Sequence, residues 1–188
     1  MERPRSQGPQ AGDARSAGPT PDQPAQPDPL PNGAGMKQVT RSIVVAAAPA
    51  RAWEGFTDRI NQWWPREHSH CQEAALDRIF IDLTQGFWGE RSLAGKIESW
   101  GIARSPTPGR TLELGWQMDA TVQPWRAEPD PAKASLITVD FTPEGEGTRV
   151  TLRHDGFERH GPGAAEMIRV MIGLDRWADW LEDYARSL

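Results

Sequence analysis

The chain has 188 residues, a formal net charge of −5 and a pI near 5.4. This length suits one domain with a substantial core, and the acidic balance disfavours a nucleic-acid-binding protein, which would carry a basic face. The single cysteine excludes an internal disulfide and any zinc site built on paired cysteines. No apolar run reaches the roughly eighteen residues of a membrane helix, and the first residues show no charged-then-apolar signal pattern, so we expect no membrane partner and a cytoplasmic location.

The first 36 residues differ in composition from the rest. They hold eight of the 17 prolines and five of the 18 glycines, and they contain no aromatic residue. Such a segment cannot bury enough apolar surface to offset the entropy lost on ordering, so we expect a disordered tail over 1–36 and one domain over 37–188. One hypothesis is that Met36 is the true first residue of the native protein, which an intact-mass measurement tests.

Residues 39–63 predict a strand followed by a short helical pair. The stretch VTRSIVVAAA is rich in β-formers and ends at Pro49, which is well suited to the first turn of a helix. Apolar residues then recur at helical spacing, and the stripe divides near Asp58 into two short helices that end at Pro65. The stripe consists of Ala52, Trp53, Phe56, Ile60 and Trp63.

Six further segments predict antiparallel strands. They cover 77–83, 86–92, 94–104, 110–118, 135–141 and 148–154. The last two flank TPEGEG, a strong hairpin signal. Alternation places Leu112, Leu114, Trp116 and Met118 on one face of their strand, and it places Val150, Leu152 and His154 on one face of the last strand.

The C-terminal region predicts a long amphipathic helix that begins at Pro162 or Gly163. Its apolar residues repeat every three to four positions up to Tyr184. Gly173 interrupts the pattern and predicts a kink or a close backbone approach. Strands followed by a helix on one face indicate an α+β fold of two layers.

Four stretches together resemble a known superfamily. They are VVAAAPARAWEGFTD, INQWWP, GKIESWGIARSPTPGRTLELGWQ and VDFTPEGEGTRVTLRHDGFERHG, within about residues 38–187. The order of these stretches is similar to that of the helix-grip fold of the START-like, SRPBCC superfamily, in the branch of the C-terminal domain of the activator of heat shock protein 90 ATPase. The resemblance implies a curved antiparallel sheet of about six to seven strands around a long C-terminal helix, with a cavity between them.

The resemblance also implies three alternative functions. The first is binding of a small apolar or amphipathic ligand in the cavity, without a dedicated catalytic site or cofactor. The second is a co-chaperone-like or stress-related interaction module. The third is a lyase, cyclase or hydrolase acting on a hydrophobic substrate, for which an acid/base pair such as Glu90 with His154 would be the discriminating feature.

We expect the cavity to be lined by large aromatic residues and a few polar groups. Trp116, His154 and two helix residues would face it if the Trp116 face of the sheet is the inner one, and Trp88 and Glu90 share a strand face. The opposite interpretation is that these side chains only fill the core. The predicted lining residues are Trp63, Trp88, Glu90, Trp116, His154, Met171 and Trp177.

Three residues in the loop after Pro65 have metal-binding chemistry. His68, His70 and Cys71 could offer two imidazoles and a thiolate, but the sequence contains no second cysteine and no H-x-x-x-H pattern. We therefore predict no metal site and assign these residues to a linking loop. His160 is assigned to a solvated loop.

Trp180 lies off the main stripe of the C-terminal helix. We therefore predict that it is exposed and that it provides the contact of a homodimer or of another protein partner.

Overall fold

The computed structural model describes residues 37–71 and 75–188. The predicted tail over 1–36 lies outside the described residues. The described residues contain no helix that is long and apolar enough to cross a membrane.

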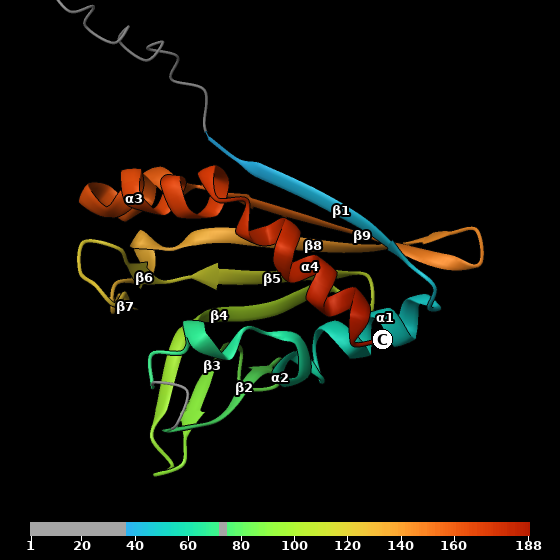
Figure 1. Cartoon of the computed structure of the whole chain (residues 1–188), viewed down its shortest axis with the longest axis horizontal. Helices are drawn as coiled ribbons and strands as arrows, with labels where there is room; N and C mark the ends of the chain where they lie inside the picture. The colour runs from blue at the N-terminus through green and yellow to red at the C-terminus, as the bar shows by residue number, and fades with distance from the viewer. Residues whose placement is uncertain (1–36, 72–74) are drawn as a thin grey trace, which may run out of the picture. The chain divides into compact units, whose positions relative to one another are not determined.

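The domain is built on a curled sheet of seven antiparallel strands, in the order β1-β9-β8-β5-β4-β3-β2 (Figure 1). The strands are β1 (Val39–Val45), β2 (Leu76–Asp82), β3 (Phe87–Ser92), β4 (Ile97–Thr107), β5 (Thr111–Trp116), β8 (Ser135–Glu144) and β9 (Gly147–Asp155). A separate small ribbon pairs β6 (Met118–Asp119) with β7 (Arg126–Ala127). The α+β class and the number of strands predicted from the sequence are confirmed.

The hairpin of β8 and β9 shows how the local sequence determines register. The pairing runs from Leu136↔Asp155 to Glu144↔Gly147, and Gly145 takes a positive φ of 58° at the turn. This register places Val150, Leu152 and His154 on one face, as predicted, and the structure buries that face in the core. The solvent-facing residues between them are polar, which fixes the strand against slipping by one residue.

A close approach of β4 and β5 depends on glycine. Gly101 has a φ of 146°, and a Cβ atom there would collide with the carbonyl oxygen of Gly115. The residues next to these glycines, Trp100 and Trp116, lie on the two adjoining strands. This approach supplies part of the pocket wall described below.

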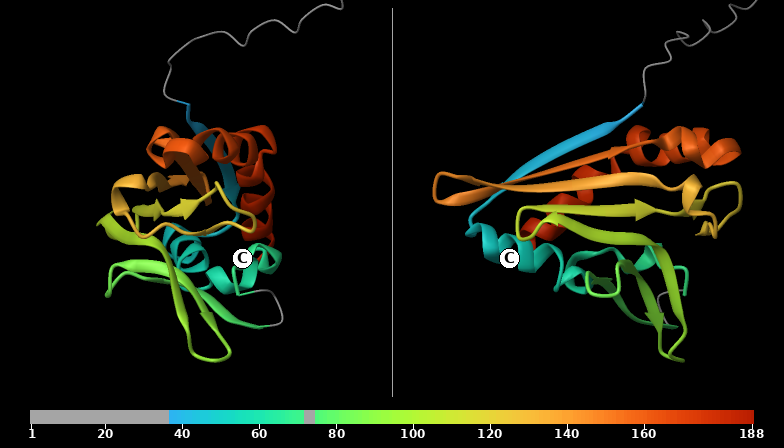
Figure 2. Two further views of the ribbon diagram at one scale, coloured as in Figure 1. Left: turned by 90° about the vertical axis from the view of Figure 1, so that its left-hand side faces the viewer. Right: turned by 180° about the vertical axis from the view of Figure 1, so that it is seen from behind.

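The helices lie on one face of the sheet (Figure 1). The pair α1 (Pro49–Phe56) and α2 (Ile60–Trp63) follows β1 as predicted, and Pro49 occupies the first turn. A short 3-10 turn, η1 (Arg66–His68), continues from Pro65, and a second, η3 (Pro131–Lys133), precedes β8. The sheet curls around α4, which Figure 2 shows from two further sides.

The C-terminal helical region is segmented, whereas the sequence predicted one long helix. It consists of η4 (Phe157–Gly163), α3 (Ala164–Ile168), a π-helical turn η5 (Arg169–Gly173) and α4 (Arg176–Arg186). The break lies at Asp175, which has a φ of 50°, two residues after the predicted interruption at Gly173. Its carboxylate accepts a hydrogen bond of 2.7 Å from Arg41 of β1, so a contact with a distant strand holds the unusual backbone in place.

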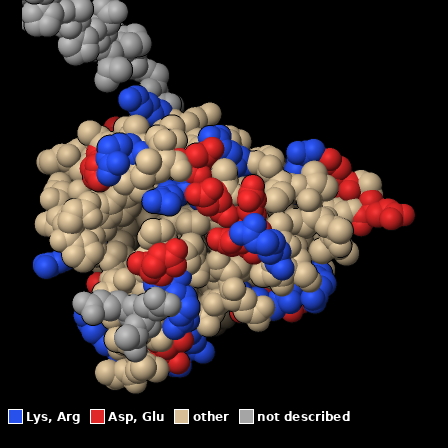
Figure 3. All heavy atoms as spheres, in the orientation of Figure 1, with Lys and Arg blue, Asp and Glu red and all other residues tan. Residues whose placement is uncertain are grey.

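Charged side chains of both signs are interspersed on the surface. Figure 3 shows Lys and Arg mixed with Asp and Glu over the described part of one face. Several of them form surface ion pairs, such as Arg104 with Glu113 and Lys133 with Glu128. On the face shown, basic and acidic residues alternate, in keeping with the net charge of −5.

Candidate ligand-binding pocket

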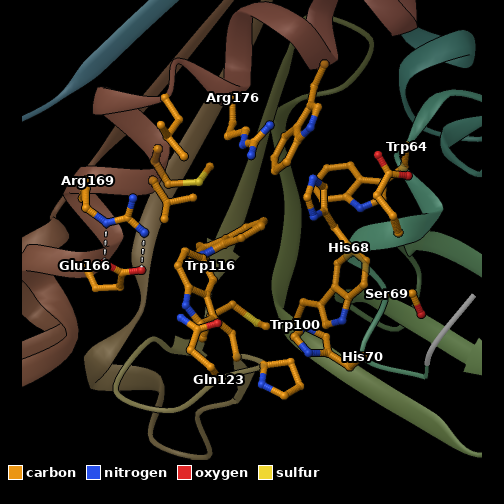
Figure 4. Close-up of a pocket in the computed structure, with 18 residues that line it drawn as sticks. Trp64, His68, Ser69, His70, Trp100, Trp116, Gln123, Glu166, Arg169 and Arg176 are labelled. Atoms are coloured by element: carbon orange, nitrogen blue, oxygen red, sulfur yellow. Dashed lines mark hydrogen bonds and ion pairs between the residues drawn. The ribbon is translucent and has the colours of Figure 1, made fainter.

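A pocket of about 510 Å³ opens between the sheet and the C-terminal helical region. Four parts of the chain line it: the segment from α2 to His70, the strands β4 and β5 with Met118, the loop at 123–125, and residues of α3, η5 and α4 (Figure 4). The size of the pocket falls within the range of about 300 to 1,000 Å³ that is typical of small-molecule sites.

Indole rings form the main wall of the pocket. Trp64 packs against three other indoles of this wall, with ring centroids 5.4 Å from Trp100, 6.1 Å from Trp116 and 4.8 Å from Trp180. Trp64 follows α2 directly, and the extended backbone that Pro65 imposes on it turns the chain away from the helix. Trp125, from the loop after β6, is the fifth tryptophan of the lining.

Three of these indoles have an unpartnered N–H group. The Nε1 atoms of Trp64, Trp100 and Trp116 are buried and have no acceptor among the described residues. A buried donor without a partner destabilises a fold by about 1–3 kcal/mol, so such groups are uncommon in cores and call for an explanation. All three belong to the pocket wall.

A second set of tryptophans has its N–H groups fully bonded. Trp63 donates to the carbonyl oxygen of Gly55 at 3.1 Å, and Trp88 donates to that of Gly115 at 2.7 Å. Trp177 donates to Nδ1 of His154 at 3.1 Å. None of these three lines the pocket.

Charged and polar side chains also line the pocket. Glu166 and Arg169 form a bidentate ion pair, with both N–O distances at 2.7 Å. Partial burial lowers the pKa of His68, Glu67 acts in the opposite direction, and the Arg176 guanidinium lowers the pKa further. His68 is therefore neutral at pH 7, and its ring lies 5.6 Å from that of Trp180.

The loop that carries His68 and His70 is anchored by a buried carboxylate. Glu90 accepts hydrogen bonds from Ser69 Oγ at 2.7 Å, from the His70 amide at 3.1 Å and from the Cys71 amide at 2.8 Å. Burial first, and then hydrogen bonding and repulsion from Glu90, raise the pKa of the Cys71 thiol to about 11. At neutral pH the thiol is therefore protonated and a poor nucleophile.

A continuous chain of hydrogen bonds runs from Trp177 to Met118 of the pocket lining. Because an indole N–H only donates, His154 accepts at Nδ1 and carries its proton on Nε2, which donates to Ser135 Oγ at 2.7 Å. The Ser135 hydroxyl then donates to His160 Nε2 at 2.8 Å, and His160 Nδ1 donates to the Met118 carbonyl at 3.1 Å. Burial lowers the pKa of both histidines, that of His154 strongly, so both are neutral at pH 7.

Comparison with known families now identifies the domain. Residues 46–186 match the family described as Activator of Hsp90 ATPase homolog 1-like protein. The chain belongs to this family. A search of curated proteins finds no match.

Solved structures related to this Activator of Hsp90 ATPase homolog 1-like domain share its fold. It is 29% identical to an anthrahydroquino-gamma-pyrone synthase, Txn09, complexed with SUM, with a TM-score of 0.54 over 80% of this chain and 96% of that one. It is 27% identical to CalC, a self-sacrificing resistance protein from Micromonospora echinospora, with a TM-score of 0.55 over 79% and 92% of the two chains. The Aha1 dimer from Colwellia psychrerythraea, at 16% identity and a TM-score of 0.52 over 81% and 96%, shows the fold alone.

Of the seven residues predicted to line the cavity, two belong to the pocket lining and five do not. In this Activator of Hsp90 ATPase homolog 1-like domain, Trp116 and Met171 line the pocket. The other five, Trp63, Trp88, Glu90, His154 and Trp177, are buried outside the lining. Their side chains are held by core partners: Trp63, for example, packs 4.9 Å from Phe56 and 5.6 Å from Tyr184. Whether any of the seven contacts a ligand stays a prediction.

Two predictions of exposure are wrong. Trp180 is 5% exposed and forms part of the pocket wall, because Trp177, Trp180, Leu181 and Tyr184 share the one buried face of α4. The ring centroids of Trp177 and Trp180, three residues apart, lie 4.9 Å from each other. His160 is 6% exposed, since it closes the hydrogen-bond chain through Ser135. Because Trp180 is buried, its side chain does not offer the exposed contact that was predicted for a homodimer.

The structure also brings together pocket residues that the sequence argument missed. Trp64, Trp100, Trp125 and Trp180 complete the indole lining. A usable signal was present for Trp180 in its spacing of three from Trp177. His68 and His70 lie at the pocket mouth, and no group of three or more metal-ligating side chains occurs within 37–71 and 75–188.

Proposed function

We propose that the domain binds a small, mainly apolar ligand in the pocket between the sheet and the C-terminal helices. The observation that carries this proposal is the pocket of about 510 Å³ with its five tryptophans. Apolar burial contributes about 25 cal/mol per Å² of area removed from water, and indole walls provide a large area for it.

The unpartnered indole donors favour a ligand that carries oxygen acceptors. Trp64, Trp100 and Trp116 each present a buried N–H without an acceptor in the described chain. A carbonyl or hydroxyl oxygen on the ligand would provide the missing partner after small side-chain movements. A ligand with a planar apolar body and a few oxygen atoms at its edge therefore suits this wall best.

The relatives support the same class of ligand. The 29% identical synthase has a name that refers to an anthrahydroquinone and a pyrone, both of which are flat and oxygen-bearing. We propose by analogy that this chain binds a molecule of similar shape. The catalytic alternative gains no support from Glu90 and His154, because each is held in its own hydrogen-bond network.

The protein-interaction alternative came from the family resemblance, and its predicted contact residue was an exposed tryptophan in the last helix. Since Trp180 is buried and lines the pocket, that surface does not offer the expected aromatic anchor. Binding of a small molecule is therefore the function that the geometry supports best.

A fluorescent naphthyl probe tests the proposal. N-phenyl-1-naphthylamine is uncharged and apolar, and it should bind the wild-type domain with an increase in its emission. Val170 lines the pocket, so Val170→Trp should fill the space and weaken binding by about tenfold or more, which corresponds to roughly 1.4 kcal/mol. Leu93→Trp provides the matched control because Leu93 is 71% exposed and lies outside the pocket. Equal probe binding by both variants, or none by the wild type, would contradict the proposal.

A further inference from the structure

Arg176 differs from the other arginine of the pocket in having no acidic partner. Arg169 is neutralised by its bidentate pair with Glu166. Arg176, the first residue of α4, also lines the pocket and is half-buried, yet it forms no ion pair with any residue in the described parts of the chain. In Figure 4 its guanidinium points from the helix toward the cavity, on the side of His68.

The surroundings of Arg176 leave its charge largely uncompensated. Glu67 also lines the pocket, but it is exposed and beyond ion-pair distance from Arg176. His68 is neutral at pH 7, and Met171 and Leu174 of the helical side are apolar. Of the nearby acidic residues, Asp175 pairs with Arg41, Glu166 pairs with Arg169, and Asp179 in the first turn of α4 forms no ion pair with Arg176. Because a half-buried cation has lost part of its hydration, an anion placed beside it is attracted more strongly than at an open surface.

We infer that Arg176 selects ligands that carry an oxygen anion, such as a carboxylate, sulfonate or phenolate, at one end of an apolar aromatic body. The planar guanidinium offers paired N–H donors that match two oxygens of such a group. The indole wall holds the aromatic body, and Arg176 orients it by its charged end. This inference rests on the proposed function and adds to it the charge of the ligand.

Two probes with a common body separate the charge from the apolar contribution. 1-Anilinonaphthalene-8-sulfonate has the same anilinonaphthalene body as N-phenyl-1-naphthylamine, with an added sulfonate. The wild-type domain should bind the sulfonate more tightly than the neutral probe at low ionic strength. The advantage should shrink as salt is raised, because the pair is partly solvent-accessible.

Substitutions at Arg176 should change only the affinity for the charged probe. A charge-assisted contact of this kind corresponds to about a five- to tenfold loss of sulfonate affinity in Arg176→Gln, with the neutral probe within about twofold of the wild type. Arg176→Lys should restore most of the loss. Arg78→Gln removes the same charge from an exposed position on β2 outside the pocket, and it should leave both affinities unchanged.

The outcomes distinguish the two proposals. Failure of the neutral probe to bind the wild type would overturn the proposed function. Binding of the neutral probe together with an equal sulfonate affinity in the wild type, Arg176→Gln and Arg78→Gln would overturn the inference about Arg176 and leave the pocket standing. A thermal melt of each variant shows whether the fold is intact. If Arg176→Gln is unfolded, the sulfonate affinities of Arg176→Lys, which keeps the charge, and Arg176→Met, which lacks it, are compared instead.

Discussion

Two sets of tryptophans in one domain have opposite hydrogen-bonding states. Trp63, Trp88 and Trp177 lie in the closed core, and each donates its indole N–H to a backbone carbonyl or to His154. Trp64, Trp100 and Trp116 are nearly as buried, but their N–H groups lack acceptors in the described chain. The second set is the one that lines the pocket.

The difference shows that burial alone does not separate a structural tryptophan from a binding one. In the core, the indole N–H of each tryptophan is hydrogen-bonded to an acceptor of the protein, so it needs no partner molecule. In the pocket, apolar contacts between rings hold the indoles while their donors stay free. The indole walls therefore combine packing with a capacity to bind oxygen-bearing molecules.

Removal of one N–H from each set should have unequal effects on stability. Trp177→Phe leaves the buried Nδ1 of His154 without a donor and should lower the free energy of unfolding by about 2–3 kcal/mol, from the unpaired acceptor and the lost volume. Trp116→Phe removes a donor that has no acceptor, so it should lower stability by about 1 kcal/mol or less. Urea unfolding of both variants measures the difference. Equal losses would mean that the two sets are energetically alike.

Low pH should destabilise the fold through two buried histidines, His154, which accepts from Trp177, and His160. Burial lowers the pKa of His154 and His160 below the unfolded value of about 6.5, so the unfolded chain binds more protons between that value and the folded pKa. The free energy of unfolding should therefore fall as pH drops below about 6.5, by up to roughly 1.4 kcal/mol per pH unit for each histidine.

The histidine responsible can be isolated by substitution. His154→Asn should reduce the steepness of this pH dependence relative to the wild type, whatever its effect at pH 7. Chemical unfolding at several pH values between 5 and 7.5 provides the measurement. An unchanged slope in His154→Asn would assign the acid sensitivity to other groups.

The sequence allowed prediction of the fold because its signals are local and mutually consistent. Alternation in RTLELGWQM places Leu112, Leu114 and Trp116 on one face, which the structure shows to be the buried one. The turn at Gly145 fixes the β8–β9 register. The break at Asp175 was not located, because the contact that stabilises it comes from Arg41, more than a hundred residues away. The spacing of residues along the helix cannot identify a contact with a residue so distant in the sequence.

The pocket was only partly predictable for a related reason. Trp116 and Met171 follow from strand and helix periodicity, and the structure places both in the lining. Periodicity could not separate Trp88 from Trp100, since the two face the same interior and differ only in that Trp88 meets the Gly115 carbonyl. Which indole finds an acceptor is decided by tertiary contacts across strands.

The indole N–H signals in a two-dimensional ¹H–¹⁵N spectrum test the central claim most directly. The nine tryptophans give separate Nε1–H signals, which single Trp→Phe variants assign. On addition of N-phenyl-1-naphthylamine, the signals of Trp64, Trp100 and Trp116 should shift, while those of Trp63 and Trp177 stay in place. Shifts confined to Trp63 and Trp177, or a spectrum unchanged at saturating probe, would contradict the account.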